Sequence, residues 1–152
     1  GDLIFLDFPK DKPEVLEQGF SETLFGFAPD TVMRGTDDYL FIFDNEEKIK
    51  SINVNYEEIS KLDSRGAIAS SKDSEGNIVS RCFYPKYGVN EDPVTGSAHT
   101  LIIPYWSGVL GRTKIKARQL SERGGELFCE VSTDRIKIGG HTSLFFDGQI
   151  EI

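Results

Sequence analysis

The sequence is poor in the residues that build disulfide frameworks, metal centres and basic surfaces. Its 152 residues include two cysteines and two histidines, too few ligands for a disulfide scaffold or a thiolate metal cage. We therefore expect no metal site and a reducing, cytoplasmic setting. There are 17 lysines and arginines against 25 aspartates and glutamates, which gives a net charge of −8. Nucleic acid and membrane surfaces are therefore not expected as partners.

The sequence also lacks a hydrophobic run long enough to cross a membrane. The longest uncharged stretch, from Pro93 to Gly111, is broken by prolines, glycines and polar residues. No signal peptide is expected at the start of the chain. Because the chain begins at Gly1 and its only methionine is Met33, we expect a trimmed chain or a piece of a longer one. Its length and its 38% hydrophobic residues predict a single globular domain over residues 1–152.

Short runs of apolar residues between turn-forming residues predict a chain rich in strands. Strands are expected at residues 3–8, 39–43, 67–69, 78–84, 115–120, 127–131, 135–138, 143–146 and 149–152. Short helices are expected from Pro13 and over residues 56–62, because Pro13 is a favourable first-turn residue and apolar side chains recur every third position from Tyr56.

One longer helix is predicted from Ser97 to Leu110, and its apolar residues cover an arc wider than that of an ordinary surface helix. Such a helix requires cover on several sides. With strands before and after it, the predicted fold class is α+β, a curled, mostly antiparallel β-barrel wrapped around this one central apolar helix. Pro104 has no amide proton, so the Thr100 carbonyl loses its usual partner four residues on.

The segment that joins a strand to this helix contains the candidate site. It reads Glu91-Asp92-Pro93-Val94-Thr95-Gly96-Ser97-Ala98-His99. The first amides of a helix bind anions, and Thr95 and Ser97 are also able to cap them. Asp92 beside the amides of Gly96, Ser97 and Ala98 could hold a zwitterionic amino acid, with the amides on its carboxylate. The competing interpretation is a structural Asp-Pro turn with a helix cap, which many inactive proteins contain.

Other catalytic arrangements do not fit the residues. Ser97 and His99 are two positions apart on a helix and do not face each other, which excludes a nucleophile and base pair. His99 falls on the apolar arc and is interpreted as a packed core histidine, and His141 follows two glycines in a turn. The roles of both histidines stay open. The polar corner from Gln119 to Leu127 is interpreted as a turn between two strands.

Two motifs together resemble the phenazine-biosynthesis PhzF family, which has the diaminopimelate-epimerase-like fold. The first lies between Ser80 and Leu110 and includes Arg81, Phe83, Pro85, the 91–99 segment and Pro104-Tyr105-Trp106; the second is Gln119-Leu120-Ser121 followed by Arg123-Gly124-Gly125. The resemblance covers the whole chain but only the C-terminal half of the family, whose members have two pseudo-symmetric halves with the active site between them.

The resemblance implies an isomerase or epimerase that needs no cofactor or metal and moves a proton on a small amino or hydroxy carboxylic acid. By resemblance Asp92 is the catalytic aspartate, and Gly96 and Ser97 bind the substrate at the helix start. The family's catalytic glutamate and a partner histidine lie in the N-terminal half, outside this chain, so we expect this chain alone to be inactive. Relatives of the same fold that use a thiol pair have a cysteine before this helix, where this chain has Asp92, so the carboxylate chemistry is favoured.

Two functions are therefore considered. The chain is either the substrate-binding half of a PhzF-like isomerase or a non-catalytic binding or assembly module that needs a partner half. The physiological substrate cannot be identified from the sequence. If the missing half normally covers the cleft, the rim around Tyr84, Tyr87, Val89 and the helix start is exposed, which predicts a homodimer or weak self-association.

Overall fold

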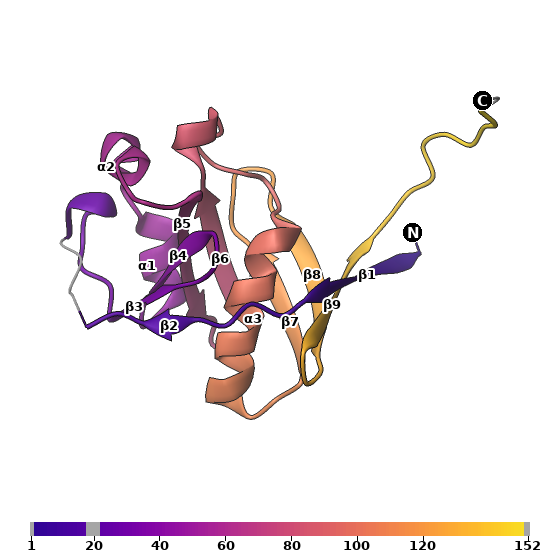
Figure 1. Ribbon diagram of the computed structural model, residues 1–152, viewed down its shortest axis with the longest axis horizontal. Coiled ribbons are helices and arrows are strands. Elements are labelled where there is room, and N and C mark those ends of the chain that lie inside the picture. The colour runs from indigo at the N-terminus through magenta and orange to yellow at the C-terminus, as the bar shows by residue number, and fades with distance from the viewer. Residues whose placement is uncertain (1, 18–21, 151–152) are drawn as a thin grey trace.

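The computed structural model describes residues 2–17 and 22–150, and these residues form one nine-stranded sheet with helices on both faces (Figure 1). The strands are β1 (Leu3–Pro9), β2 (Glu14–Val15), β3 (Thr31–Arg34), β4 (Asp38–Ile42), β5 (Gly66–Lys72), β6 (Ile78–Phe83), β7 (Lys114–Gln119), β8 (Gly125–Val131) and β9 (Arg135–His141). The helical segments are η1 (Glu22–Leu24), α1 (Glu46–Ser51), α2 (Tyr56–Ser60), η2 (Pro85–Tyr87) and α3 (Gly96–Leu110).

The sheet is mixed, with the strand order β1-β9-β8-β7-β6-β5-β4-β3-β2. Two pairs are parallel, β4 with β5 and β6 with β7, and the other pairs are antiparallel. The chain between β4 and β5 contains α1 and α2, and the chain between β6 and β7 contains α3. Because β5 and β6 are antiparallel, two right-handed crossovers place these helices on opposite faces.

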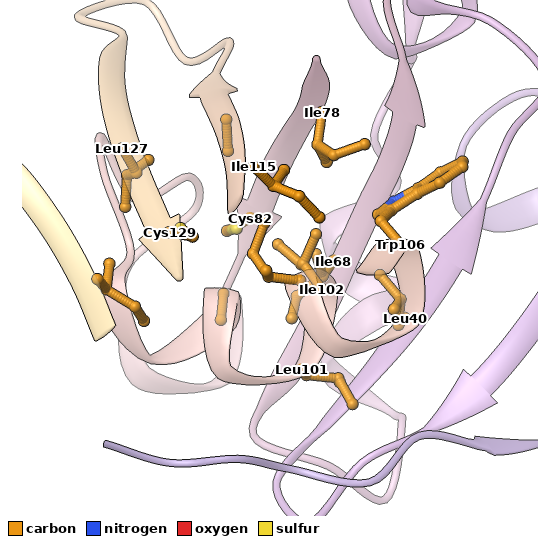
Figure 2. Close-up of a cluster of buried hydrophobic side chains, with 14 of the residues drawn as sticks. Leu40, Ile68, Ile78, Cys82, Leu101, Ile102, Trp106, Ile115, Leu127 and Cys129 are labelled. Atoms are coloured by element: carbon orange, nitrogen blue, oxygen red, sulfur yellow. The ribbon is translucent and has the colours of Figure 1, made fainter. Parts of the chain in front are cut away.

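The two faces of the central strands bury different residues, as the alternation of side chains along a strand requires. On one face Leu40, Ile68 and Cys82 pack with Ile102 and Trp106 of α3 (Figure 2). On the other face Phe41, Ala69 and Phe83 pack under α1 and α2, where Phe25 meets Phe41 edge to face at 5.0 Å. The predicted strand over residues 39–43 is therefore confirmed as buried on both faces.

The closed, curled barrel expected from the sequence is wrong, because the sheet is open. Its edge strands, β1 and β2, are consecutive in the chain and do not pair with each other. Between them the chain runs past α3, where the amide of Asp11 donates to the Thr100 carbonyl at 3.1 Å. This is the carbonyl that Pro104 leaves without a helical partner. The helix expected from Pro13 is also wrong, because Glu14 and Val15 pair with β3.

Most of the predicted local elements are confirmed. The strands on both sides of residues 73–77 form the antiparallel pair β5 and β6, and α2 occupies most of the expected 56–62 helix. The strand expected at 143–146 is wrong, since residues 142–150 form no element and extend away from the sheet (Figure 1). The strand expected at 149–152 is wrong for residues 149 and 150, and its last two residues lie outside the described ones.

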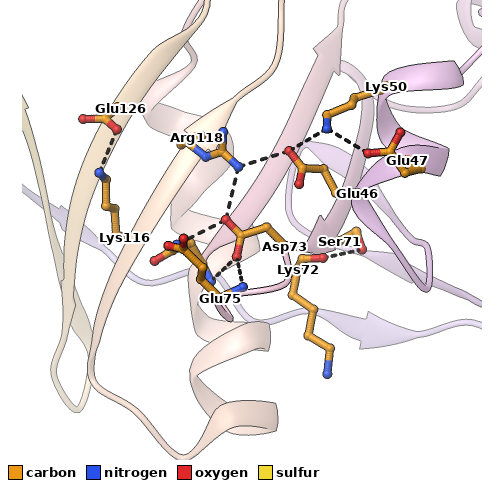
Figure 3. Close-up of polar contacts among 11 residues, drawn as sticks. Glu46, Glu47, Lys50, Ser71, Lys72, Asp73, Glu75, Lys116, Arg118 and Glu126 are labelled. Carbon is orange, nitrogen blue, oxygen red and sulfur yellow. Dashed lines mark hydrogen bonds and ion pairs between the residues drawn. The ribbon is translucent and has the colours of Figure 1, made fainter.

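Beside the apolar core under α1 and α2, charged side chains hold α1 against the sheet. Arg118 of β7 contacts Glu46 of α1 and Asp73 of the β5–β6 turn, both at 3.1 Å (Figure 3). The Asp73 carboxylate also accepts hydrogen bonds from the backbone amides of Glu75 and Asn77, both at 2.9 Å. Burial alone would raise the pKa of Asp73, but the hydrogen bond from the Asn77 side chain, together with these contacts, lowers it. The side chain of Arg118 therefore lies on the α1 side of the sheet, opposite its neighbour Gln119.

Candidate functional site

The chain between β6 and α3 is fixed at several points before the helix begins. Tyr84 and Val89 form an isolated antiparallel bridge, and Gly88 takes a left-handed φ of 79° between them. Arg81 then binds both carboxylate oxygens of Glu91 at 2.7 Å in a bidentate pair. One residue later the amide of Asp92 donates to the Cys82 carbonyl at 2.9 Å. These contacts place Asp92 beside the end of β6.

Asp92 lies half-buried next to the start of α3. The hydroxyl of Thr95 donates to its carboxylate in a short hydrogen bond. Thr95 occupies the N-cap position with extended φ and ψ of −113° and 97°, but its side chain does not cap the helix. The sequence allowed Thr95 to act as a cap, and the structure directs its hydroxyl to Asp92 instead. The amides of the first turn therefore receive no cap from Thr95.

The predicted binding residues Gly96, Ser97 and Ala98 form the first turn of α3, directly after the Asp92 segment. A methyl group at Gly96 would meet no atom within 4 Å, so the space beside this backbone is open. The side chain of Ser97 is exposed, whereas the methyl group of Ala98 is buried in the core. Ala98 can therefore contribute only its backbone to a site on the surface.

A corner between β7 and β8, residues 119–125, packs against the same segment. The hydroxyl of Ser121 donates to the Pro93 carbonyl at 2.7 Å and accepts the Gly124 amide at 3.0 Å. A Cβ atom at Gly125 would lie 2.1 Å from the Val94 side chain, so a larger residue there would force Val94 to move. We call residues 84–95 and 119–125 together the clamped loops.

Gln119 begins this corner, and its role was missed from the sequence. It is 1% exposed and makes hydrogen bonds to the 92–95 segment through both ends of its side-chain amide. The interpretation of this corner as only a turn is therefore incomplete, because Gln119 also holds the 92–95 segment. The signal was present, because alternation along β7 places Gln119 on the buried face with Ile115 and Ala117.

A cavity of about 440 Å³ lies against the clamped loops. It is lined by Glu91, Pro93, Ser121, Glu122 and Arg123. Two of these residues flank Asp92 in sequence, and the other three belong to the corner. The cavity therefore adjoins the candidate site and carries charges of both signs.

His99 is a core residue, as its position on the apolar arc predicts. It is fully buried, and its Nδ1 lies 2.7 Å from the Thr95 carbonyl, which requires the proton to be on Nδ1. Burial lowers its pKa to about 4, although the hydrogen bond to Thr95 opposes the shift. Ser97 is exposed, so the two side chains do not form a catalytic pair.

Neither cysteine has the environment of a reactive thiol. Both are free and buried. Burial raises the pKa of the Cys82 thiol and raises that of Cys129 to about 12. The buried thiols stay protonated near neutral pH, so the structure offers no thiolate for epimerase chemistry.

The rim expected around Tyr84, Tyr87 and Val89 is only partly exposed. Tyr87 and Val89 are exposed, but Tyr84 is 7% exposed and packs under the Arg65 guanidinium, which lies 5.2 Å from its ring centre. Tyr84 was expected on the surface, and this expectation is wrong. Its bridge to Val89 turns the ring inward against β5, where Gly66 leaves room for it.

Within residues 2–17 and 22–150, no group of three or more histidine, cysteine, aspartate or glutamate side chains is arranged to hold a metal ion. Over the same residues no helix is both long enough and apolar enough to cross a membrane.

The fold and this segment are those of a known protein family. The chain belongs to the PhzC-PhzF family, described as phenazine biosynthesis-like protein, which it matches over residues 9–148. The family resemblance of the sequence motifs is thereby confirmed. A crystal structure of a PhzF-family phenazine biosynthesis protein from Enterococcus faecalis is 37% identical and superposes with a TM-score of 0.88, covering 99% of this chain and 58% of that one.

Relatives described as uncharacterized isomerases show the same relation. One from Pseudomonas aeruginosa is 39% identical over all of this chain and 59% of its own length. Another, from Halalkalibacterium halodurans, is 40% identical over 92% of this chain and 54% of its own length. The chain therefore spans between about half and three fifths of the length of these relatives.

Proposed function

We propose that the chain, residues 1–152, is the substrate-binding, C-terminal half of a cofactor-independent PhzF-like isomerase or epimerase. The substrate would be a small amino or hydroxy carboxylic acid, and the setting a cytoplasm in which both cysteines stay reduced. The observation that carries the proposal is the Asp92 carboxylate beside a helix start that Thr95 does not cap. The names of the two bacterial relatives as isomerases support the reaction class.

In this proposal the two ends of the substrate have different partners. The amides of Gly96, Ser97 and Ala98 receive the carboxylate, because the helix start carries partial positive charge and free donors. Asp92 accepts a hydrogen bond from the substrate's ammonium or hydroxyl group. The open space at Gly96 lets the carboxylate approach the backbone.

Asp92 also assists the proton transfer. The family's catalytic glutamate, which lies outside this chain, would take the proton from carbon, and Asp92 would steady the charge that develops on the substrate. The chain alone is then expected to bind the acid without turning it over.

The test uses the full protein in which this chain is joined to the remaining part of a PhzF-like sequence. Candidate amino and hydroxy acids are incubated in deuterium oxide, and isomerisation and carbon-bound deuterium are followed by NMR. We expect Asp92→Asn to lower kcat by about 10²-fold or more. Ser97→Ala keeps the backbone donor and serves as the milder variant. If both variants bind and turn over substrate like the parent, the site assignment is wrong.

A second candidate function is a non-catalytic assembly module. The observation that favours it is an exposed apolar end, which comprises β1 and residues 142–150 and includes Ile4, Leu6, Leu144, Phe145 and Phe146 as exposed side chains. Such a surface favours association with a partner half or a second copy. A homodimer or weak self-association is proposed on this ground.

Sedimentation velocity at several protein and salt concentrations tests the association. The net charge of −8 opposes it at low ionic strength, and salt screens that repulsion. We therefore expect the average mass to rise with both salt and protein concentration. A monomer under every condition would contradict self-association.

A further inference from the structure

The side chain of Gln119 joins the catalytic candidate to a distant strand. It lies at the end of β7, 27 residues after Asp92, and its amide is buried. A buried amide that only filled space would lose free energy through its unpaired polar atoms. Gln119 instead makes its hydrogen bonds to two residues of the segment that enters α3.

The orientation of this amide is fixed by the backbone. Thr95 N–H can only donate, so the atom 2.8 Å from it must be the Gln119 oxygen. The Gln119 nitrogen then faces two acceptors, the Asp92 carbonyl at 2.5 Å and the Thr95 hydroxyl oxygen at 3.2 Å. An inverted amide would place its nitrogen against the Thr95 N–H donor and its oxygen against the Asp92 carbonyl acceptor.

This orientation also fixes the hydroxyl of Thr95. Its oxygen accepts from Gln119, so its one proton is left for the Asp92 carboxylate, to which it donates. The bonds run in one direction, from the Gln119 amide through the Thr95 hydroxyl to the Asp92 carboxylate. The backbone of Asp92 is held by the same amide.

We propose that Gln119 is a positioning residue that holds the Asp92 carboxylate in a single orientation at the start of α3. The inference rests on the proposed function for its catalytic consequence, but the orientation itself is a property of this chain. Gln119 acts through Thr95 and through the Asp92 carbonyl and does not itself touch substrate.

The experiment compares four variants in pairs. Gln119→Met keeps the length of the side chain and removes its hydrogen bonds, and Gln119→Glu keeps an acceptor for Thr95 N–H while replacing the donor with a second oxygen. Thr95→Val removes the hydroxyl at nearly constant volume, and Thr95→Ser retains it. The last variant is the conservative control that should rescue the effect.

The first measurement is NMR of the chain without substrate. In the parent and Thr95→Ser, three-bond couplings should show a single Asp92 side-chain rotamer. In Gln119→Met, Gln119→Glu and Thr95→Val we expect an average over rotamers. Hydrogen exchange at the Thr95 amide should be roughly tenfold faster in Gln119→Met than in the parent, since its hydrogen bond to the Gln119 oxygen is lost. A single unchanged Asp92 rotamer in both Gln119→Met and Thr95→Val would overturn the proposal.

The second measurement uses the active full protein of the preceding subsection. Gln119→Met and Thr95→Val should each lower kcat by about 10²-fold through misplacement of Asp92, while KM changes little. Their double variant should be no slower than either single variant, because both break one chain of bonds. A merely structural role would instead give losses of kcat that add in the double variant, or losses that Thr95→Ser shows as well as Thr95→Val. Either result would overturn the proposal.

The two measurements separate this inference from the proposed function. If the parent shows no turnover with any acid, the proposed function fails while the NMR result still decides the positioning role. If Gln119→Met does not fold, Gln119→Glu decides it together with the Thr95→Val and Thr95→Ser pair, since Gln119→Glu removes the donor to the Asp92 carbonyl and the Thr95 pair tests the hydroxyl.

Discussion

The clamped loops and the exposed apolar end are built in opposite ways. In the clamped loops, polar groups of Asp92, Thr95 and Gln119 find partners within the chain, from two neighbouring segments. In the exposed apolar end, Phe145 and Phe146 lie in solvent and β1 pairs on one side only. The first arrangement is fixed before any ligand arrives, whereas the second leaves apolar surface for another partner. The proposed chemistry lies in the clamped loops, and the proposed association lies at the exposed apolar end.

The largest expected difference comes from the same truncation at a core phenylalanine and at an exposed one. Phe41→Ala removes a fully buried ring that packs against Phe25, and it should cost about 3–5 kcal/mol of unfolding free energy. Phe145→Ala should change that free energy by less than about 0.5 kcal/mol. Urea unfolding measures both. A large loss for Phe145→Ala would mean that residues 142–150 pack against the body of the protein.

The next effect is a loss of stability in mild acid caused by His99. The folded-state pKa of about 4 lies below the ordinary value of 6.5, so the unfolded chain binds more protons between these pH values. Stability from the neutral histidine is complete above pH 6.5 and is lost as the pH falls toward 4. The loss amounts to about 3 kcal/mol at 1.36 kcal/mol per pKa unit.

His99→Gln is the control for this acid effect, because carboxylates also titrate in the same range. Urea unfolding from pH 7 to 4 should give a flatter profile for the variant than for the parent. Parallel profiles would show that His99 does not contribute to the pH dependence.

A smaller effect is expected where the two clamped loops touch. Gly125→Ala places a methyl group within 2.1 Å of the Val94 side chain and should cost about 1–3 kcal/mol by overpacking. Gly140→Ala is the matched control, because its methyl group would meet one backbone oxygen at 3.9 Å. Combining Gly125→Ala with Val94→Ala should recover part of the loss. Equal stability of the two single glycine variants would show that the loops are not in contact.

The smallest effect separates two ion pairs. Glu91→Gln weakens the bidentate pair with half-buried Arg81 and should cost about 1–2 kcal/mol. Lys114 and Glu130 form an exposed pair at 3.9 Å, and Glu130→Gln should cost less than about 0.5 kcal/mol. Thermal unfolding at low and high salt compares them. A larger loss of stability in Glu130→Gln than in Glu91→Gln would show that the Arg81–Glu91 pair does not anchor the segment that contains Asp92.

The parts of the structure that depend on residues close together in the sequence could be predicted. The β5–β6 pair, α2, α3 and the core position of His99 follow from turn residues and apolar spacing. The turn and helix start from Asp92 to Ala98 were predicted in the same way, because Pro93 and the apolar helix lie within a few residues of each other, whereas the role of this segment in binding rests on the family resemblance and stays a prediction.

What could not be predicted depends on contacts between distant segments. Pro13 suits a helix, but pairing of Glu14 and Val15 with β3 decides their structure. Residues 143–146 have strand-forming side chains but no neighbouring strand, so they form none. Alternation along β7 indicates that Gln119 is buried, but its link to Asp92 spans 27 residues and no local pattern indicates that partner.

The central claim, that the start of α3 binds a small carboxylic acid beside Asp92, is tested most directly by an NMR titration. The labelled chain is titrated with amino-aromatic and hydroxy acids, in the parent and in Asp92→Asn. The account predicts saturable shifts centred on the amides of Gly96, Ser97 and Ala98, with weaker binding in Asp92→Asn. Shifts confined to another surface, or identical affinity in Asp92→Asn, would contradict it.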